Sequence, residues 1–335
     1  MSRAARSRGV ALVNALVVVA ALAAISAALL IRTERALERQ GLRNQTDQLA
    51  AFLDAGQDQA LAELARLLDA RTDAVTRPGQ GWDRPRQVPI DRGALSWAFT
   101  DLQGRFNLGW LADEGAVGDL AREAFARLAE ELELPQALTA RLIRAAGPDR
   151  LARASALDLP RGPELPLVLA QQLAGAARPA DGGAAALAPL WPLVAALPPR
   201  AGLNPETAPL PVLRAFLPGI DAEDWLAFET LRAAGGLAAI GGLQGFAAQH
   251  GAEGAVAMLQ LLPQDMDSDW FELRLTAQLD SRSLARSAVV ALRPDPDAPR
   301  PQQAAPRVVL ALPVAVDPAI PAPSPSAASA PAVTE

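Results

Sequence analysis

The chain has 335 residues, half of them hydrophobic, and a formal net charge of −6 at neutral pH. The length allows one large domain or two ordinary ones, and the charge disfavours a nucleic-acid binder that relies on a basic surface. There is no cysteine and only one histidine, His250, at a predicted helix end, where a surface or capping role is favoured. Disulfides, thiolate zinc sites and multi-histidine metal sites are therefore excluded, and the composition argues against an enzyme.

The N-terminal region holds an apolar run from Val10 to Ile31, in which only Asn14 and Ser26 are polar. As a helix it spans about 33 Å, enough to cross a hydrocarbon core of roughly 30 Å. The run follows three arginines without an acidic residue, so the positive-inside rule predicts that the N-terminus stays in the cytoplasm and that the rest of the chain lies on the other side of the membrane. Four of the residues expected to anchor the subunit in the membrane are Leu12, Leu16, Val17 and Leu22.

The helical pattern continues beyond the apolar run, and no proline occurs from Met1 to Arg77. The small residues of the run lie inside it, which disfavours a cleaved secretory signal. The pattern predicts one long helix, half in lipid and half outside, with Gly41 and Gly56 as its soft points.

A short basic leader that ends in Gly9 before an apolar helix resembles the precursor of a type IV pilin or pseudopilin. The resemblance implies that a prepilin peptidase cuts after Gly9 and leaves Val10 as the mature, methylated N-terminus. Most such proteins carry glutamate at the fifth mature position, where this chain has Asn14. The K-type minor pseudopilins of type II secretion omit that glutamate. A buried carboxylate in lipid is costly unless it is paired, so a subunit without a neighbour above it has no use for one.

Residues 95–111 read LSWAFTDLQGRFNLGWL. Leu95, Trp97 and Phe99 alternate with smaller or more polar residues, which predicts a half-buried strand. A turn follows, in which Gly104 can take a positive φ. The stretch resembles the K-type hallmark I-x-D-x-x-G-(K/R)-(F/I/L)-N-L-N-x-L, although Gly109 replaces its second asparagine. The matching residues are Asp101, Gly104, Arg105, Asn107, Leu108 and Leu111.

The middle of the chain, from Asp113 to about Leu262, has helical spacing with breaks marked by proline. Helices are expected over 119–134 and from Pro135 to Arg144, and a loop over 176–189. Residues 198–243 resemble a helix-hairpin-helix unit, but residues 201–250 hold five acidic and two basic side chains. That charge repels a phosphate backbone, so a structural role without nucleic acid is expected. The K-type resemblance implies an α-helical insertion of this kind.

An acidic loop follows, with carboxylates at alternate positions in Asp265, Asp267 and Asp269. The spacing is similar to the start of an EF-hand loop, but no glycine stands at the sixth place. A solvated acidic loop is the favoured interpretation. The family resemblance keeps weak calcium binding as an alternative, and no other cofactor is expected.

The C-terminal part alternates apolar and polar residues over 270–279 and 284–293, with a further strand over 307–312. These strands should form an antiparallel meander with the strand around Trp97. The predicted fold is α+β: a pilin-like long N-terminal helix and antiparallel sheet with a large inserted all-α domain. The expected parts are a leader (1–9), a transmembrane and assembly helix (10–31), a pilin-like helix with the first strands (32–112), the insert (113–264), the last strands (265–313) and a disordered tail (314–335).

The chain is therefore identified as a K-type minor pseudopilin, which implies a non-enzymatic tip subunit that supports protein export across the outer membrane. The implied partners are I-type and J-type minor pseudopilins, other pseudopilins, the prepilin peptidase and inner-membrane lipid. One alternative is a membrane-anchored, competence-type helix-hairpin-helix DNA receptor, which the acidic hairpin disfavours. Another is a periplasmic enzyme with a signal anchor, which lacks a recognisable catalytic constellation.

Overall fold

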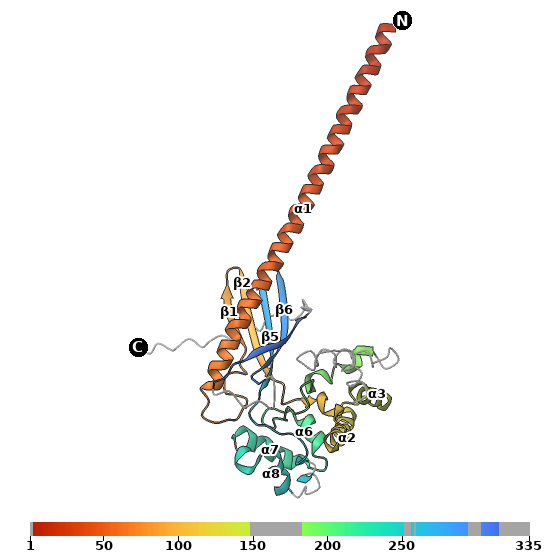
Figure 1. Ribbon diagram of the computed structural model, residues 1–335. Helices are drawn as coiled ribbons and strands as arrows, with labels where there is room; N and C mark the ends of the chain where they lie inside the picture. The colour runs from red at the N-terminus through yellow and green to blue at the C-terminus, as the bar shows by residue number, and fades with distance from the viewer. Residues whose placement is uncertain (1–2, 148–182, 251–255, 258, 294–302, 315–335) are drawn as a thin grey trace, which may run out of the picture.

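The computed structural model describes residues 3–147, 183–250, 256–257, 259–293 and 303–314. Helix α1 runs without interruption from Arg3 to Asp69, about 100 Å at 1.5 Å per residue. Its N-terminal half projects away from the body, whereas its C-terminal half lies on the sheet (Figure 1). The two predicted soft points, Gly41 and Gly56, lie inside this single helix.

The sheet has five antiparallel strands in the order β1-β2-β5-β6-β7. The predicted meander and its division in the sequence are confirmed, because β2 pairs along its whole length with β5. Strand β1 was not predicted, and β7 extends two residues beyond the predicted third strand. The strand bounds are β1 Arg86–Ile90, β2 Gly93–Asp101, β5 Trp270–Leu279, β6 Arg282–Ala291 and β7 Arg307–Val314.

Helix α1 packs on one face of this sheet. The buried side chains of α1 follow helical spacing, and those of β2 and β5 alternate along their strands, so each element offers one apolar face. Gly56 allows a close approach, because a Cβ there would lie 2.7 Å from Leu95 Cδ2. The α1 residues of this core are Leu49, Leu53, Ala60, Leu64 and Leu68.

The helical insert lies beyond the end of the sheet that is farther from the N-terminus (Figure 1). It has its own core, in which the Phe106 and Phe216 rings stack at 5.6 Å and Phe125 packs beside Phe106. A parallel two-residue pair, β3 with β4, was not predicted. The elements are β3 Phe106–Asn107, η1 Leu108–Ala112, α2 Ala116–Glu131, α3 Gln136–Ala146, η3 Gly183–Leu187, η4 Trp191–Leu193, β4 Val194–Ala195, α6 Leu210–Phe216, α7 Ala222–Ala233, η5 Ala238–Ile240 and α8 Gly242–Gln249.

Two predicted segments fall largely outside the described residues. They are positions 176–182 of the expected loop and positions 315–335 of the expected tail. The remainder of the loop begins with the 3-10 helix η3.

Candidate functional site

A buried polar junction joins the sheet to the helical insert, and Asp101 lies at its centre. Asp101 is the last residue of β2 and is 4% exposed. Its carboxylate accepts hydrogen bonds from Ser268 Oγ at 2.6 Å and Thr207 Oγ1 at 2.5 Å. The carboxylate also accepts hydrogen bonds from Gln103 N at 2.8 Å and from Asn204 Nδ2 at 3.0 Å. Burial raises the pKa of Asp101 above its ordinary value, and these four hydrogen bonds oppose that rise.

Asn204 links the junction to two further chain segments. Its Nδ2 lies 2.9 Å from the Thr76 carbonyl oxygen, in the loop after α1, and 2.8 Å from Ser268 Oγ, before β5. Its Oδ1 accepts from Glu206 N at 3.0 Å. The side chain is fully buried. The N-x-x-T-A stretch at Asn204 is therefore one half of the junction, in keeping with the structural role expected of the hairpin unit.

The turn after β2 packs directly against the hairpin. Gln103 Nε2 donates to the Gly202 carbonyl at 2.9 Å, and Asp269 N donates to Gln103 Oε1 at 2.5 Å. A Cβ at Gly104 would lie 2.6 Å from Thr207 Oγ1 and 2.8 Å from the Thr207 carbonyl. The positive φ expected of Gly104 is wrong, since its φ lies outside the left-handed region. Glycine is needed there because two chain segments approach closely.

Arg105 fastens the same turn to the sheet. Its Nη2 donates to Glu272 Oε2 on β5 at 2.9 Å, and both side chains are largely buried. Burial alone would raise the pKa of Glu272, but the charges of Arg105 and Arg274, with hydrogen bonds from Arg274 and Ser287, lower it overall. The Glu272 carboxylate is thus held ionised as an anchor for the turn.

Asn107 and the leucines after it begin the insert. Asn107 Oδ1 accepts from Gly109 N at 2.8 Å, which caps η1, and from Leu197 N at 3.0 Å. Its Nδ2 donates to the Pro198 carbonyl at 2.9 Å. A Cβ at position 109 would lie 2.2 Å from the Leu197 carbonyl oxygen, so this backbone excludes the hallmark's second asparagine. Leu108 and Leu111 are buried in the insert core.

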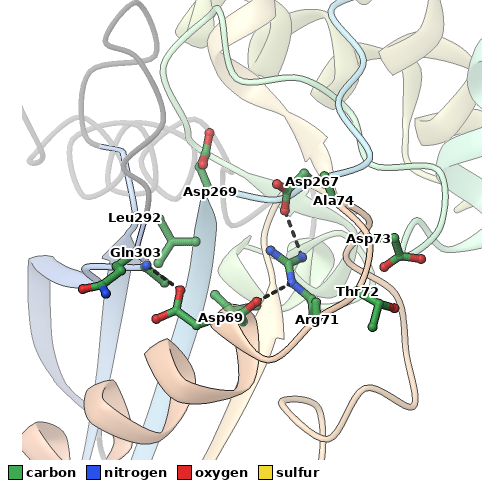
Figure 2. Close-up of a pocket in the computed structure, with 11 residues that line it drawn as sticks. Asp69, Arg71, Thr72, Asp73, Ala74, Asp267, Asp269, Leu292 and Gln303 are labelled. Atoms are coloured by element: carbon green, nitrogen blue, oxygen red, sulfur yellow. Dashed lines mark hydrogen bonds and ion pairs between the residues drawn. The ribbon is translucent and has the colours of Figure 1, made fainter.

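The acidic loop lies beside a pocket of about 510 Å³ at the end of α1 (Figure 2). Asp267 pairs with Arg71 at 2.9 Å, and Asp269 pairs with Arg293 at 2.7 Å. Asp265 Oδ2 lies 4.0 Å from Arg293 Nη2. Across the described residues, no group of three or more His, Cys, Asp or Glu side chains could hold a metal ion. The loop is paired with arginine rather than solvated as predicted, and the arginines compete with calcium for the same carboxylates.

Two titratable side chains of the insert differ in their surroundings. Glu206 is 1% exposed, and neither carboxyl oxygen has a hydrogen-bond partner among the described residues. Burial raises the pKa of Glu206, although Arg77 and Arg232 oppose the rise. His250 caps the C-terminus of α8, as expected, and its Nδ1 lies 2.7 Å from Asp224 Oδ1.

The hairpin between α6 and α7 lacks the features of a phosphate site. Gly219 has a φ of 90° in its loop. The Asp221 side chain accepts from Asp224 N at 2.9 Å and so occupies the N-terminus of α7 with a carboxylate. Glu223 and Asp224 add two further negative charges in the first turn. This disfavours the DNA-receptor alternative, because phosphate needs free N–H groups and positive charge.

The predicted processing and membrane residues all lie in the projecting half of α1. Gly9, Val10 and Asn14 belong to its first turns, together with Leu12 and Val17. Leu16 is 71% exposed and Leu22 is 59% exposed. In the part of the chain that the structure describes, no helix meets the length and hydropathy expected of a membrane span.

The sequence and the fold are both similar to known proteins. The chain matches no protein-family model. It is 30% identical over 232 residues to the type II secretion system protein K of Pseudomonas aeruginosa, which covers 62% of this chain and 67% of that protein. Its fold is similar to a chain in the crystal structure of the GspK-GspI-GspJ complex from the type 2 secretion system of enterotoxigenic Escherichia coli. The TM-score is 0.55 at 19% identity, covering 83% of this chain and 100% of that one.

Proposed function

The chain belongs to the family of type II secretion system K proteins, and we propose that it caps the pseudopilus tip with I-type and J-type minor pseudopilins. Members of this family are minor pseudopilins, which are structural components and not enzymes. In the proposed role the subunit supports protein export across the outer membrane by assembly alone.

The position of the helical insert is the observation that carries this proposal. The insert lies beyond the sheet, at the end of the molecule opposite to the projecting half of α1 (Figure 1). The junction around Asp101 and Asn204 fixes it there through buried hydrogen bonds. A pseudopilin stacked above this one would have to occupy the volume of the insert. The shape therefore suits a last subunit with nothing above it.

The proposal includes a single-pass arrangement in the bacterial inner membrane. The prepilin peptidase would cut between Gly9 and Val10, and the new N-terminus would be methylated. The N-terminus would face the cytoplasm before cleavage, and the globular part would lie in the periplasm. Support comes from the sequence, which places 22 mostly apolar residues after a basic leader.

The first experiment concerns the N-terminus. The full chain would be purified from cells with and without an active prepilin peptidase, and its N-terminus would be sequenced. We expect a start at Val10 only where the peptidase is active. A start near Ala28 or an intact Met1 in both strains would contradict the pseudopilin pathway.

The second experiment tests the tip position directly. An epitope on the C-terminus of the full chain would be labelled with gold on overproduced pseudopili. We expect label at one end of each filament and recovery of the I-type and J-type proteins with the solubilised chain. Label spread along the filaments would contradict capping.

Asn14 offers a third test. A subunit with nothing above it does not need a glutamate at the fifth mature position, so Asn14→Glu should leave secretion unchanged or impair it. Asn14→Ala serves as the control for side-chain loss. Better secretion by Asn14→Glu than by the unmodified chain would contradict the capping argument.

A further inference from the structure

We propose that four arginines on one face of the projecting half of α1 bind an acidic stripe on the helix of a neighbouring pseudopilin. Successive members of the set are three, four and four positions apart, which places their side chains on one helix face. All four are exposed. This inference rests on the proposed function, because it names the chemistry of the partner beside the tip subunit. The arginine stripe consists of Arg32, Arg35, Arg39 and Arg43.

The arginine stripe is self-repulsive in the isolated subunit. Arg35 and Arg39, and then Arg39 and Arg43, are like charges four positions apart, an arrangement that destabilises a helix. Among the described residues no carboxylate pairs with them, and the Arg39 Nε instead donates to the Arg35 carbonyl at 3.0 Å. Because no ion pair of the described side chains offsets this repulsion, we infer that an external partner does so.

The length of the arginine stripe distinguishes a protein partner from lipid. Arg32 directly follows the apolar run, which ends at Ile31. Arg39 lies about 10 Å further along the axis and Arg43 about 17 Å further, whereas each polar headgroup layer is only about 5–8 Å thick. Headgroups would reach Arg32 and Arg35 and leave the other two outside. A helix that leaves the membrane beside α1 would reach all four.

An apolar side chain at the edge of the stripe favours a helix as the partner. Leu42 is 44% exposed and follows Arg35 by seven positions, so it lies on the same face one heptad later. Charged residues that flank apolar contacts set partner choice and orientation in paired helices. The expected partner surface has carboxylates three to four positions apart beside an apolar seam.

The test is a charge reversal in the full chain, Arg35→Glu with Arg39→Glu and Arg43→Glu, co-expressed with the I-type and J-type proteins. We expect partner recovery from detergent extracts at 0.1 M salt to fall by about tenfold. The triple Arg→Lys variant should retain most of the recovery, because it keeps the charge. Arg66→Glu, on the same helix but outside the stripe, should retain all of it. Salt near 1 M should weaken the unmodified complex selectively, because the Debye length shrinks to about 3 Å.

The outcomes separate this inference from the proposed function. Equal recovery by the unmodified chain and by the triple-glutamate variant would overturn the inference alone. Failure of the unmodified chain to recover any partner would overturn the proposed function. The same recovery of partner proteins can be measured in nanodiscs with and without the anionic lipid phosphatidylglycerol. If recovery requires phosphatidylglycerol and is lost in the triple-glutamate variant, the stripe binds lipid and the inference is overturned. If the unmodified chain recovers as much partner protein in nanodiscs of phosphatidylcholine alone as in those with phosphatidylglycerol, the inference is supported.

Discussion

Asp101 gathers four donors from three chain segments around one carboxylate. Every hydrogen bond to a charged acceptor contributes about 1.5–3 kcal/mol, and three of the four donors contact the same oxygen, Oδ2. An amide at this position would turn an –NH2 group toward donors, or leave them facing a weaker acceptor. The residue therefore depends on its negative charge as well as its shape.

We predict that Asp101→Asn lowers the free energy of unfolding by about 3 kcal/mol or more. Urea unfolding of the full chain in detergent, followed by circular dichroism, measures the change. Asp91→Asn, in the exposed hairpin between β1 and β2, is the matched control and should change little. Equal midpoints for the two variants would contradict this account of the junction.

Glu206 should make stability depend on pH. Its folded pKa is raised by burial above its ordinary value of 4.5. Its contribution to stability is therefore fully present below pH 4.5 and is lost as the pH rises through the folded pKa. The neutral Glu206→Gln side chain removes this dependence, so the variant should gain stability relative to the unmodified chain as pH rises. Asp101 is present in both proteins, so the contribution of its titration to stability cancels in the difference between them.

The measurement is the difference in urea midpoint between Glu206→Gln and the unmodified chain across acidic to neutral pH. Glu123→Gln, on the exposed face of α2, is the control and should show no such trend. A constant difference across that range would show that Glu206 titrates normally in the folded protein.

The sequence identified part of the junction and missed the rest for a physical reason. Asp101 and Asn107 were found through a resemblance that extends over one continuous stretch. Thr76, Asn204 and Ser268 meet only because the chain returns from 128 and 64 residues away. No local periodicity encodes such a meeting. Thr76 and Ser268 therefore carried no signal in the sequence, and Asn204 was noticed only as part of a hairpin motif.

At the scale of elements, alternation and helical spacing predicted most of the fold. Strands β2 and β5 bury every second side chain against α1, so the pattern was visible. Strand β1 was missed because it is a short edge strand that contains Pro89, and its side chains alternate between half-buried and exposed, with none fully buried. The two-residue strands β3 and β4 are set by the contact of Asn107 with Leu197, which is not a local property.

The two glycines of α1 should respond in opposite ways to alanine. Gly41 has open space around its would-be Cβ, so Gly41→Ala should stabilise the local helix by about 0.5–1 kcal/mol. Slower hydrogen exchange of the backbone amides around position 41 would measure this gain. At Gly56 the added Cβ meets the buried Leu95 side chain, and overpacking of about 1–3 kcal/mol outweighs the helix gain.

Gly56→Ala should therefore lower the urea midpoint of the body. Adding Leu95→Val, which makes room for the new methyl group, should recover part of the loss. A higher midpoint for Gly56→Ala alone would mean that α1 can shift on the sheet without cost.

At the scale of the whole molecule, two large apolar cores are joined by the polar junction and by a small apolar cluster, in which Trp270 and Ala291 of the sheet pack with Leu197 and Ala201 of the insert. One core joins α1 to the sheet and holds Trp82 and Trp97, and the other lies in the helical insert and holds Trp110 and Trp225. Cooperative unfolding of the body should therefore depend on the junction together with this small cluster. Buried groups that lose their partner cost about 1–3 kcal/mol each.

We predict that Asn204→Ala separates the unfolding of the two cores. In the unmodified body, tryptophan fluorescence from either core should report the same midpoint. In Asn204→Ala, variants that keep tryptophan in one core only should report different midpoints. Arg214→Ala, which removes an ion pair to Glu131 within the insert, is the control and should leave the midpoints together. Coincident transitions in Asn204→Ala would show that other contacts couple the cores.

Because the strands of the sheet are far apart in the sequence, the ribosome synthesises them at different times. Residues 102–269 separate β2 from β5, its partner along the whole strand. At a synthesis rate of about 5–20 residues per second, β2 emerges roughly ten seconds or more before β5. During that interval β2 can pair only with β1, whose register ends at Trp97, and the carboxylate of Asp101 has no Ser268. A product truncated before β5 can complete neither the sheet nor the junction.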